Sequence, residues 1–260
     1  MTVYSDVHCH LSFPEFDADR ESVITRLRDA GVGLLIDPGT DAETSRRSIG
    51  LASENDFIYA NVGLHPSEVD TPFTPQLYDE LARLAGAEKV VGIGEIGLDY
   101  HWPGHNAELQ LVAFREMLRM AASLDLPVAI HCRDAWPDML RVLSEEQHSG
   151  LRGMMHCFSG DLDTARRCIG FGLKISVPGT ITYKRSPLPE IVSAVGLQDI
   201  LSETDAPYLS PVPMRGNRNE PAHVALTVQA VADARPEAFE TVADALLRNA
   251  CGLFGISLPF

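Results

Sequence analysis

Short runs rich in Val, Ile and Leu alternate with segments of helical period along the whole chain, and this alternation restricts the fold more than any other feature. About eight such strand-and-helix units fit into 260 residues, which is typical of a (β/α)8 TIM barrel; a doubly wound open sheet is the competing arrangement. We predict an α/β fold with a single barrel domain over residues 1–260. The expected strands are residues 3–10, 32–38, 58–64, 90–96, 127–132, 153–158, 174–177 and 200–204.

Helix-start signals stand between several of these runs. A Thr-Pro pair at residues 74–75 is expected to open a helix whose inner face carries Leu77, Leu81 and Leu84. Residues 107–124 form the longest helical pattern. These segments supply the outer layer that a barrel requires.

The balance of charge restricts the function classes. The chain has 36 Asp and Glu against 21 Lys and Arg, a formal net charge of −15. A surface that coats long nucleic acid needs clustered Lys and Arg, so we expect no broad basic track. A pocket that accepts a few phosphates beside bound cations is compatible with this charge.

Targeting signals are missing from the sequence. The N-terminus has no basic region followed by an apolar core, and no apolar run approaches the about 20 residues that span a bilayer. The 5 cysteines include no Cys-x-x-Cys pair. Cys9, Cys132 and Cys157 each follow a histidine, so strand alternation is expected to turn their thiols away from the histidines. We predict a cytoplasmic protein with reduced cysteines, no membrane contact and no obligate protein partner.

His8 and His10 stand one residue apart at the end of the first expected strand. Side chains two positions apart on a strand share a face, so the two imidazoles project together. A barrel gathers its reactive groups at the C-terminal ends of several strands. Further candidates at such ends are His65, Glu95, His131, His156 and Asp205.

This set of imidazoles and carboxylates predicts a metal centre. Such donors accept zinc, manganese, iron or nickel, and magnesium where oxygen ligands dominate. Glu95 lies in a glycine-rich strand near the middle of the order and is the candidate to bridge two ions. The neighbouring Gly92, Gly94 and Gly97 either make room for the cluster or serve packing alone.

Seven segments resemble the TatD family of metal-dependent deoxyribonucleases, in order and over nearly the whole chain. They are residues 6–11 (DVHCHL), 63–66 (GLHP), 94–99 (GEIGLD), 131–135 (HCRDA), 156–160 (HCFSG), 203–209 (ETDAPYL) and 215–221 (RGNRNEP). The resemblance implies a TIM barrel of the metal-dependent hydrolase type. One departure is Ser12, where family members often carry Asp; the position lies outside the expected metal shell.

The resemblance also implies a division of ligands between two divalent ions, which would be Mg, Mn or Zn. One ion is expected on His8, His10, Glu95 and Asp205, and the second on Glu95, His131 and His156. Asp205 would orient or deprotonate the attacking water. His65 would bind the phosphate or assist the leaving group.

The activity implied is 3′–5′ exonucleolytic cleavage of single-stranded DNA, or of RNA. Because the chain is acidic, we expect nucleic-acid ends or short oligonucleotides as partners. Arg133 and Arg218 are the candidate phosphate contacts; solvated charge or an internal salt bridge is the alternative for each. Trp102, Tyr183 and Tyr208 either stack a terminal base or pack at the rim.

Alternative functions would use the same site. A D-aminoacyl-tRNA deacylase or a small-molecule amidohydrolase would direct the same water at an acyl carbon, and an inactive metal-binding scaffold would do no chemistry. Glu203 is expected below Asp205, hydrogen-bonded to a ligand histidine. Asp99 and Asp134 are expected to cap loops, and His148 to be structural or solvated.

Overall fold

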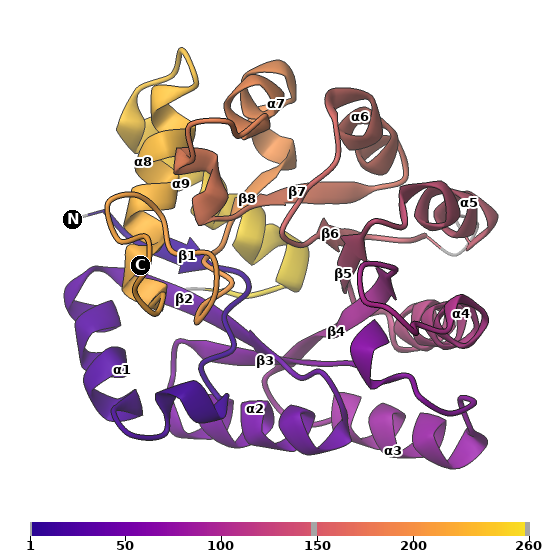
Figure 1. Ribbon diagram of the computed structural model, residues 1–260. Coiled ribbons are helices and arrows are strands. Elements are labelled where there is room, and N and C mark those ends of the chain that lie inside the picture. The colour runs from indigo at the N-terminus through magenta and orange to yellow at the C-terminus, as the bar shows by residue number, and fades with distance from the viewer. Residues whose placement is uncertain (1, 147–149, 258–260) are drawn as a thin grey trace.

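Eight parallel strands follow one another in chain order around a barrel in the computed structural model, with helices on the outside (Figure 1). The structure describes residues 2–146 and 150–257. The strands are β1 (Tyr4–Asp6), β2 (Val32–Pro38), β3 (Ile58–Val62), β4 (Val90–Asp99), β5 (Val128–Arg133), β6 (Gly153–Met155), β7 (Leu173–Val177) and β8 (Ile200–Ser202). The predicted (β/α)8 barrel is confirmed, and an open sheet is excluded.

Helices cover the outer surface of the strands. They are α1 (Arg20–Asp29), α2 (Ala42–Glu54), α3 (Pro75–Ala85), α4 (Ala107–Leu124), α5 (Trp136–Glu146), α6 (Leu162–Gly170), α7 (Leu188–Ala194), α8 (Val224–Asp233) and α9 (Phe239–Phe254). Short 3-10 turns include η1 (Pro14–Phe16), η2 (Pro66–Glu68), η4 (Gly179–Thr182), η5 (Leu197–Asp199) and η6 (Pro221–His223). None of the helices in the described residues is both long and apolar enough to cross a membrane.

The helix starts follow the sequence signals. The Thr74 hydroxyl accepts a hydrogen bond from the Leu77 amide at 3.2 Å, which caps the first turn of α3. The side-chain oxygen of Asn106 does the same for α4, accepting from the Leu109 amide at 3.1 Å. Both helices therefore begin where local chemistry satisfies their free amide groups.

The core follows the two-residue alternation of the strands. On β2, Leu34 and Ile36 pack in a cluster with Leu201 of β8 and Phe254 of α9. Leu35, between them, packs in another cluster with Leu27 of α1. One face of each strand thus fills the barrel and the other holds the helices.

Hydrogen bonds from backbone amides and one side chain close the barrel between its first and last strands. The Val7 amide donates to the Ser202 carbonyl at 3.1 Å, and the Ser202 hydroxyl donates to the Ser5 carbonyl at 2.9 Å. Past the strand ends, the Asp205 amide donates to the His8 carbonyl at 2.9 Å. We call this set of contacts the β1–β8 seam.

Four strands end earlier than expected from the sequence, and one of them is β3, which stops at Val62. β1 stops at Asp6 because its carboxylate accepts from the amides of His8 (3.3 Å) and Thr204 (2.9 Å), which turns the chain. β6 stops at Met155 and β8 at Ser202, and shortly after each the backbone enters the left-handed region, with φ +44° at Cys157 and +55° at Asp205. The polar residues therefore lie in loops just past the strands.

Candidate metal centre

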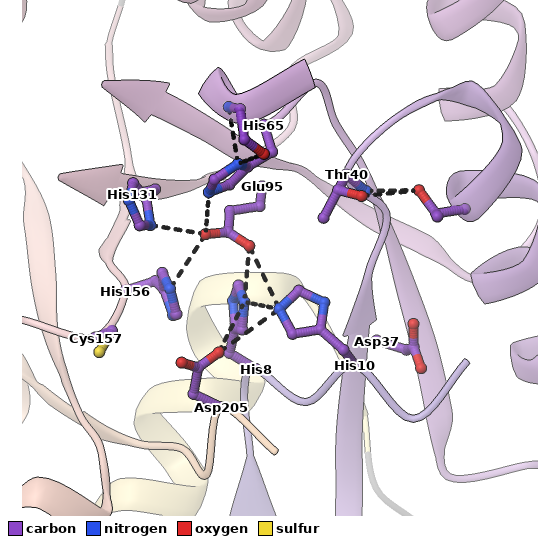
Figure 2. A network of polar contacts seen from close by, with 12 residues as sticks. His8, His10, Asp37, Thr40, His65, Glu95, His131, His156, Cys157 and Asp205 are labelled. Carbon is purple, nitrogen blue, oxygen red and sulfur yellow. Dashed lines mark hydrogen bonds and ion pairs between the residues drawn. The ribbon is translucent and has the colours of Figure 1, made fainter. Parts of the chain in front are cut away.

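Seven side chains from six strand ends converge at one mouth of the barrel (Figure 2). His8 and His10 follow β1, and His65 follows β3. Glu95 and His131 lie within β4 and β5. His156 follows β6, and Asp205 follows β8.

The carboxylate of Glu95 stands at the centre of this group. Its Oε2 lies 3.3 Å from His8 Nε2 and 3.5 Å from His10 Nε2. Its Oε1 lies 3.0 Å from His131 Nδ1 and 3.2 Å from His156 Nε2. The two oxygens thus face different imidazoles, as expected of a carboxylate that could bridge two ions.

Asp205 completes the side that faces His8 and His10. Its Oδ1 lies 3.6 Å from His10 Nε2 and 3.9 Å from His8 Nε2. The β1–β8 seam fixes its backbone, and the left-handed conformation aims the carboxylate into the mouth. Strain of this kind is common where a side chain must point at a reacting group.

Carboxylates behind two of the histidines fix their orientation. Asp99 Oδ2 lies 3.1 Å from His131 Nε2, and Glu203 Oε1 lies 3.2 Å from His156 Nδ1. Because a carboxylate only accepts, these ring nitrogens carry the protons. In their neutral forms, His131 and His156 would therefore offer the lone pairs of Nδ1 and Nε2, respectively, on the side of Glu95.

The position of Glu203 matches the expectation from the sequence, whereas the role of Asp99 was missed. Asp99 does cap a loop, since its Oδ1 accepts from the His101 amide at 2.9 Å, but it also holds His131. A signal was present: Glu95 and Asp99 are four residues apart in one strand, so both point to the same face.

His65 is at a similar distance from Glu95, with 3.3 Å between Nε2 and Oε1. Its other nitrogen, Nδ1, accepts from the Ser67 amide at 3.1 Å. A neutral His65 therefore carries its proton on Nε2, which faces the mouth as a hydrogen-bond donor. This tautomer separates His65 from the imidazoles that offer lone pairs.

Two glycines let the strands approach closely enough to form the cluster. A Cβ on Gly63 would lie 2.3 Å from the backbone nitrogen of Glu95. Gly97 has a φ of +141°, and a Cβ there would lie 2.0 Å from the His131 carbonyl oxygen. The close approach at Gly97 is to the backbone of β5 at His131, so a side chain there would displace the strand that carries this histidine.

The electrostatics of the cluster suit cations. Burial alone would raise the pKa of Glu95, but the imidazoles of His65, His156 and His8 outweigh burial and hold that pKa well below its usual value. Burial and the neighbouring His156 lower the pKa of His8 to about 3, so its imidazole is neutral. An ionised carboxylate and a neutral imidazole are the forms that bind metal.

The residues present therefore fit divalent ions. Within the described residues, three groups have donor atoms that all lie within 4.8 Å of one another: His8 with His10 and Glu95, His8 with His156 and Asp205, and His65 with Glu95 and His131. Each group combines two imidazole nitrogens with one carboxylate oxygen. In the third group, His65 could bind an ion only in the tautomer that leaves Nε2 without a proton.

A cavity of about 700 Å³ opens above the cluster. Its wall includes His10, Glu95, Asp205, Trp102, Tyr208 and Arg133. Arg133 is the one Lys or Arg of the wall within the described chain, and its guanidinium carbon lies 5.4 Å from the centre of the Trp102 ring. Trp102 is 56% exposed and Tyr208 is 48% exposed.

Arg218 is not brought into this cavity. Its two terminal nitrogens each lie 2.8 Å from an oxygen of Asp19, and the same side chain pairs with Glu220 at 3.2 Å. The guanidinium also lies over the ring of Phe16. The alternative that the sequence left open, an internal salt bridge, describes Arg218 in the structure.

The remaining expectations from the sequence concern the cysteines, Ser12 and His148. All five cysteines are free. Cys132 and Cys157 are among the residues of the cavity wall, and Cys132 also packs in the apolar core with Phe158. The left-handed backbone at Cys157 interrupts the strand alternation from which the orientation of its thiol is predicted. The Ser12 hydroxyl donates to Asp37 at 2.7 Å. His148 lies outside the described residues.

A second hollow, of about 780 Å³, lies on the outer surface beside α1 and α2. Several of its charged groups pair with one another or with near neighbours, as Arg20 does with Asp17 and Arg47 with Glu43. The described residues that line it include no histidine or cysteine, so the candidate chemistry is assigned to the mouth of the barrel.

Comparison with known proteins agrees with this assignment. Residues 5–255 match the family model described as TatD related DNase. The uncharacterized metal-dependent hydrolase YabD of Bacillus subtilis (strain 168) is 37% identical over 253 residues, which cover 97% of this chain and 99% of that protein. The 3′-5′ ssDNA/RNA exonuclease TatD of Erwinia amylovora is 34% identical over 258 residues, covering 96% and 99%. The crystal structure of YjjV, a TatD homologue from Escherichia coli K12, superposes with a TM-score of 0.92 at 34% identity and covers 98% of both chains.

Proposed function

Because this chain belongs to the family of TatD-related DNases and is a metal-dependent hydrolase, we propose that it hydrolyses phosphodiester bonds at the 3′ ends of single-stranded DNA or RNA. The observation that carries the proposal is the placement of imidazoles around both oxygens of Glu95, beside Asp205. A relative that matches along nearly its whole length is named for this exonuclease activity.

We assign the ligands of two divalent ions, Mg, Mn or Zn, in two overlapping sets. His8, His10, Glu95 and Asp205 would hold one ion, and Glu95, His131 and His156 the other. Such ions, when bound, would lower the pKa of the attacking water and neutralise charge on the phosphate. Asp99 and Glu203 keep the lone pairs of His131 and His156 turned toward the ions.

Two side chains are proposed to handle protons. The Asp205 carboxylate is 13% exposed at the cavity wall, so it can accept the proton of the attacking water at an oxygen. His65 presents an Nε2 proton toward the same space, so it can donate a hydrogen bond to the phosphate or to the departing oxygen. A base and a donor thus lie on different sides of Glu95.

The charges of the cavity wall and of the whole chain favour a substrate that enters the cavity by one end only. With Arg133 as the cation of the described wall, and with Glu68 and Asp99 also lining the cavity, the protein offers one side chain to balance a neighbouring phosphate. A long duplex would meet a chain of net charge −15. We therefore propose Arg133 as a phosphate contact and short or single-stranded ends as the substrate.

Product lengths test the proposal. The chelator-stripped protein is reloaded with Mg²⁺, Mn²⁺ or Zn²⁺ and given 5′-labelled single-stranded DNA or RNA. We expect a ladder of products that shortens from the 3′ end, and little cleavage of covalently closed duplex circles. Equal rates on circles and on single-stranded ends would contradict the proposal. Release of D-amino acids from tRNA, without shortening of DNA or RNA, would support the deacylase instead.

Asp205→Asn tests the site within the same assay. Removing the general base should lower kcat by about 10²–10⁴-fold while the protein stays folded. Asp163→Asn is the matched control, because Asp163 is a carboxylate on α6, on the outside of the barrel. If Asp205→Asn and Asp163→Asn cleave at the same rate, the assignment of Asp205 is wrong.

A further inference from the structure

Two exposed aromatic side chains lie on opposite sides of the metal centre. Trp102 follows β4, beside β5, and Tyr208 follows β8, beside β1. In the strand order of the barrel these two pairs of strands face each other across the mouth (Figure 1). Glu95 and its histidines lie between them.

Trp102 is exposed and yet its loop is held in place. The amide of Tyr100 donates to the carbonyl of Arg133 at 2.9 Å, and the His101 ring contacts Asp134 at 2.9 Å. The amide of His105 donates to the Trp102 carbonyl at 3.3 Å. The indole is thus presented to solvent by a fixed backbone, which limits the entropy lost when a ligand packs on it.

Arg133 adds charge to this side of the cavity. Its guanidinium lies over the Trp102 ring, and no carboxylate pairs with it in residues 2–146 and 150–257. The chain has more acidic than basic residues, yet the Arg133 guanidinium has no acidic partner among the described residues. Together with the exposed indole of Trp102, it suits the binding of a nucleotide. The ring can stack a base and the guanidinium can face a phosphate.

Tyr208 is held as firmly on the other side. Its amide donates to the Asp205 carbonyl at 2.9 Å, and its carbonyl accepts from the buried Asn219 side chain at 2.7 Å. The ring of Tyr208 meets the edge of His10, with 6.4 Å between centroids. Tyr183 differs, because its hydroxyl donates to the Ser210 carbonyl and it is not part of the described cavity wall.

We propose that Trp102 and Tyr208 are two stacking platforms that take the bases on either side of the scissile phosphate. This inference rests on the proposed phosphodiesterase function. Successive bases in a duplex lie about 3.4 Å apart along the axis and stack on each other. Platforms on opposite sides of the centre require these bases to separate, so the substrate class is an unpaired end of at least two nucleotides.

Fluorescence tests the platforms directly, because the chain has only 2 tryptophans. In a Trp136→Phe background, Trp102 is the sole emitter. A phosphorothioate-linked thymidine dinucleotide is added to the Mn²⁺-loaded protein. We expect it to quench the emission and to bind about tenfold more tightly than thymidine monophosphate, since one stacked base is worth roughly 1–3 kcal/mol. A blunt-ended hairpin duplex should not quench.

Substitutions test the same idea by polarisation of a labelled phosphorothioate hexathymidylate, in the otherwise unchanged protein. Trp102→Ala and Tyr208→Ala should each weaken binding about tenfold, whereas Trp102→Phe should keep most of it. Val112→Ala is the control, because it removes an exposed apolar side chain on α4. Binding by Trp102→Ala equal to that of Val112→Ala would overturn the inference.

The two hypotheses can fail separately. Quenching by the dinucleotide without cleavage of an ordinary oligonucleotide would retain the platforms and refute the nuclease activity. Cleavage from the 3′ end with neither quenching nor loss of affinity in Trp102→Ala would retain the nuclease and refute the platforms.

Discussion

Asp99 contacts His131 on the side of the ring that faces away from Glu95. It is 3% exposed, and its backbone amide donates to the buried Gln110 side chain at 2.9 Å. The carboxylate therefore has a fixed position, and through it so does the ring. A residue that touches no proposed ion thus decides which nitrogen His131 offers.

Replacing Asp99 by Ala should lower the affinity for metal by about 10–100-fold, because His131 loses the group that fixes its proton and its orientation. Competition against a chelating dye measures the change. Asp134→Ala removes an exposed carboxylate of the neighbouring loop, which pairs with His101, and should leave the affinity near that of the parent protein. Equal affinities in the two variants would refute this role of Asp99.

The orientation of a side chain could be predicted where its neighbours in the sequence determine it. The His8 and His10 rings do project together, with 3.3 Å between their Nε2 atoms, although they lie beyond the strand that was expected to hold them. Arg218 was not predictable in this way, since its partner Asp19 is 199 positions away in the chain. A salt bridge between distant segments leaves no local pattern.

At the scale of elements, the close approach of β3 and β4 depends on Gly63. It follows β3, and its missing side chain leaves room for the backbone of Gly94 and Glu95, since an added Cβ would lie 2.3 Å from an atom of each. Backbone atoms cannot move away from an added Cβ as the end of a flexible side chain can. Any larger residue here must push β4, and Glu95 with it.

Gly63→Ala should destabilise the protein by about 1–3 kcal/mol and weaken metal binding as well. Urea unfolding and metal titration measure the two effects. Gly50→Ala is the matched control, since nothing lies within 4 Å of its added Cβ in α2, and it should stabilise the helix by up to about 1 kcal/mol. A neutral result for Gly63→Ala would show that β4 is free to shift.

Element types followed from the sequence better than element lengths. The residues 32–38 and 107–124 coincide with β2 and α4 because apolar periodicity and flanking turn residues define both ends locally. β1, β6 and β8 are shorter than predicted because tertiary contacts end them: the Asp6 carboxylate, for instance, binds the Thr204 amide, which lies far along the chain. Periodicity contains no information on such contacts.

At the scale of the whole molecule, Glu220 ties the C-terminal loop to the first helix. Its carboxylate accepts from Arg26 of α1 at 2.8 and 2.9 Å and lies 3.2 Å from Arg218. Hydrogen bonding from Arg26 outweighs burial and, with Arg218, holds the pKa of Glu220 below its ordinary value of 4.5. The folded protein therefore releases this proton more readily than the unfolded chain.

This lowered pKa makes the stability of the protein depend on pH. The contribution of Glu220 to stability is complete above its ordinary pKa of 4.5 and is lost as the pH falls through the lower pKa of the folded state. Glu220→Gln should cost up to about 1 kcal/mol near neutral pH, and the difference should shrink as the pH falls below 4.5. Urea midpoints across this range measure it, with Glu21→Gln on α1 as the control. A pH-independent difference would contradict the ion pair.

The β1–β8 seam also fixes when the centre can exist during biosynthesis. His8 leaves the ribosome early, whereas Asp205 follows roughly two hundred positions later, about 10–40 s at ordinary rates of translation. Until the last strand emerges, the seam is open and its two ligand-bearing edges are apart. Products of interrupted translation therefore carry the histidines without an assembled centre and are inert as hydrolases.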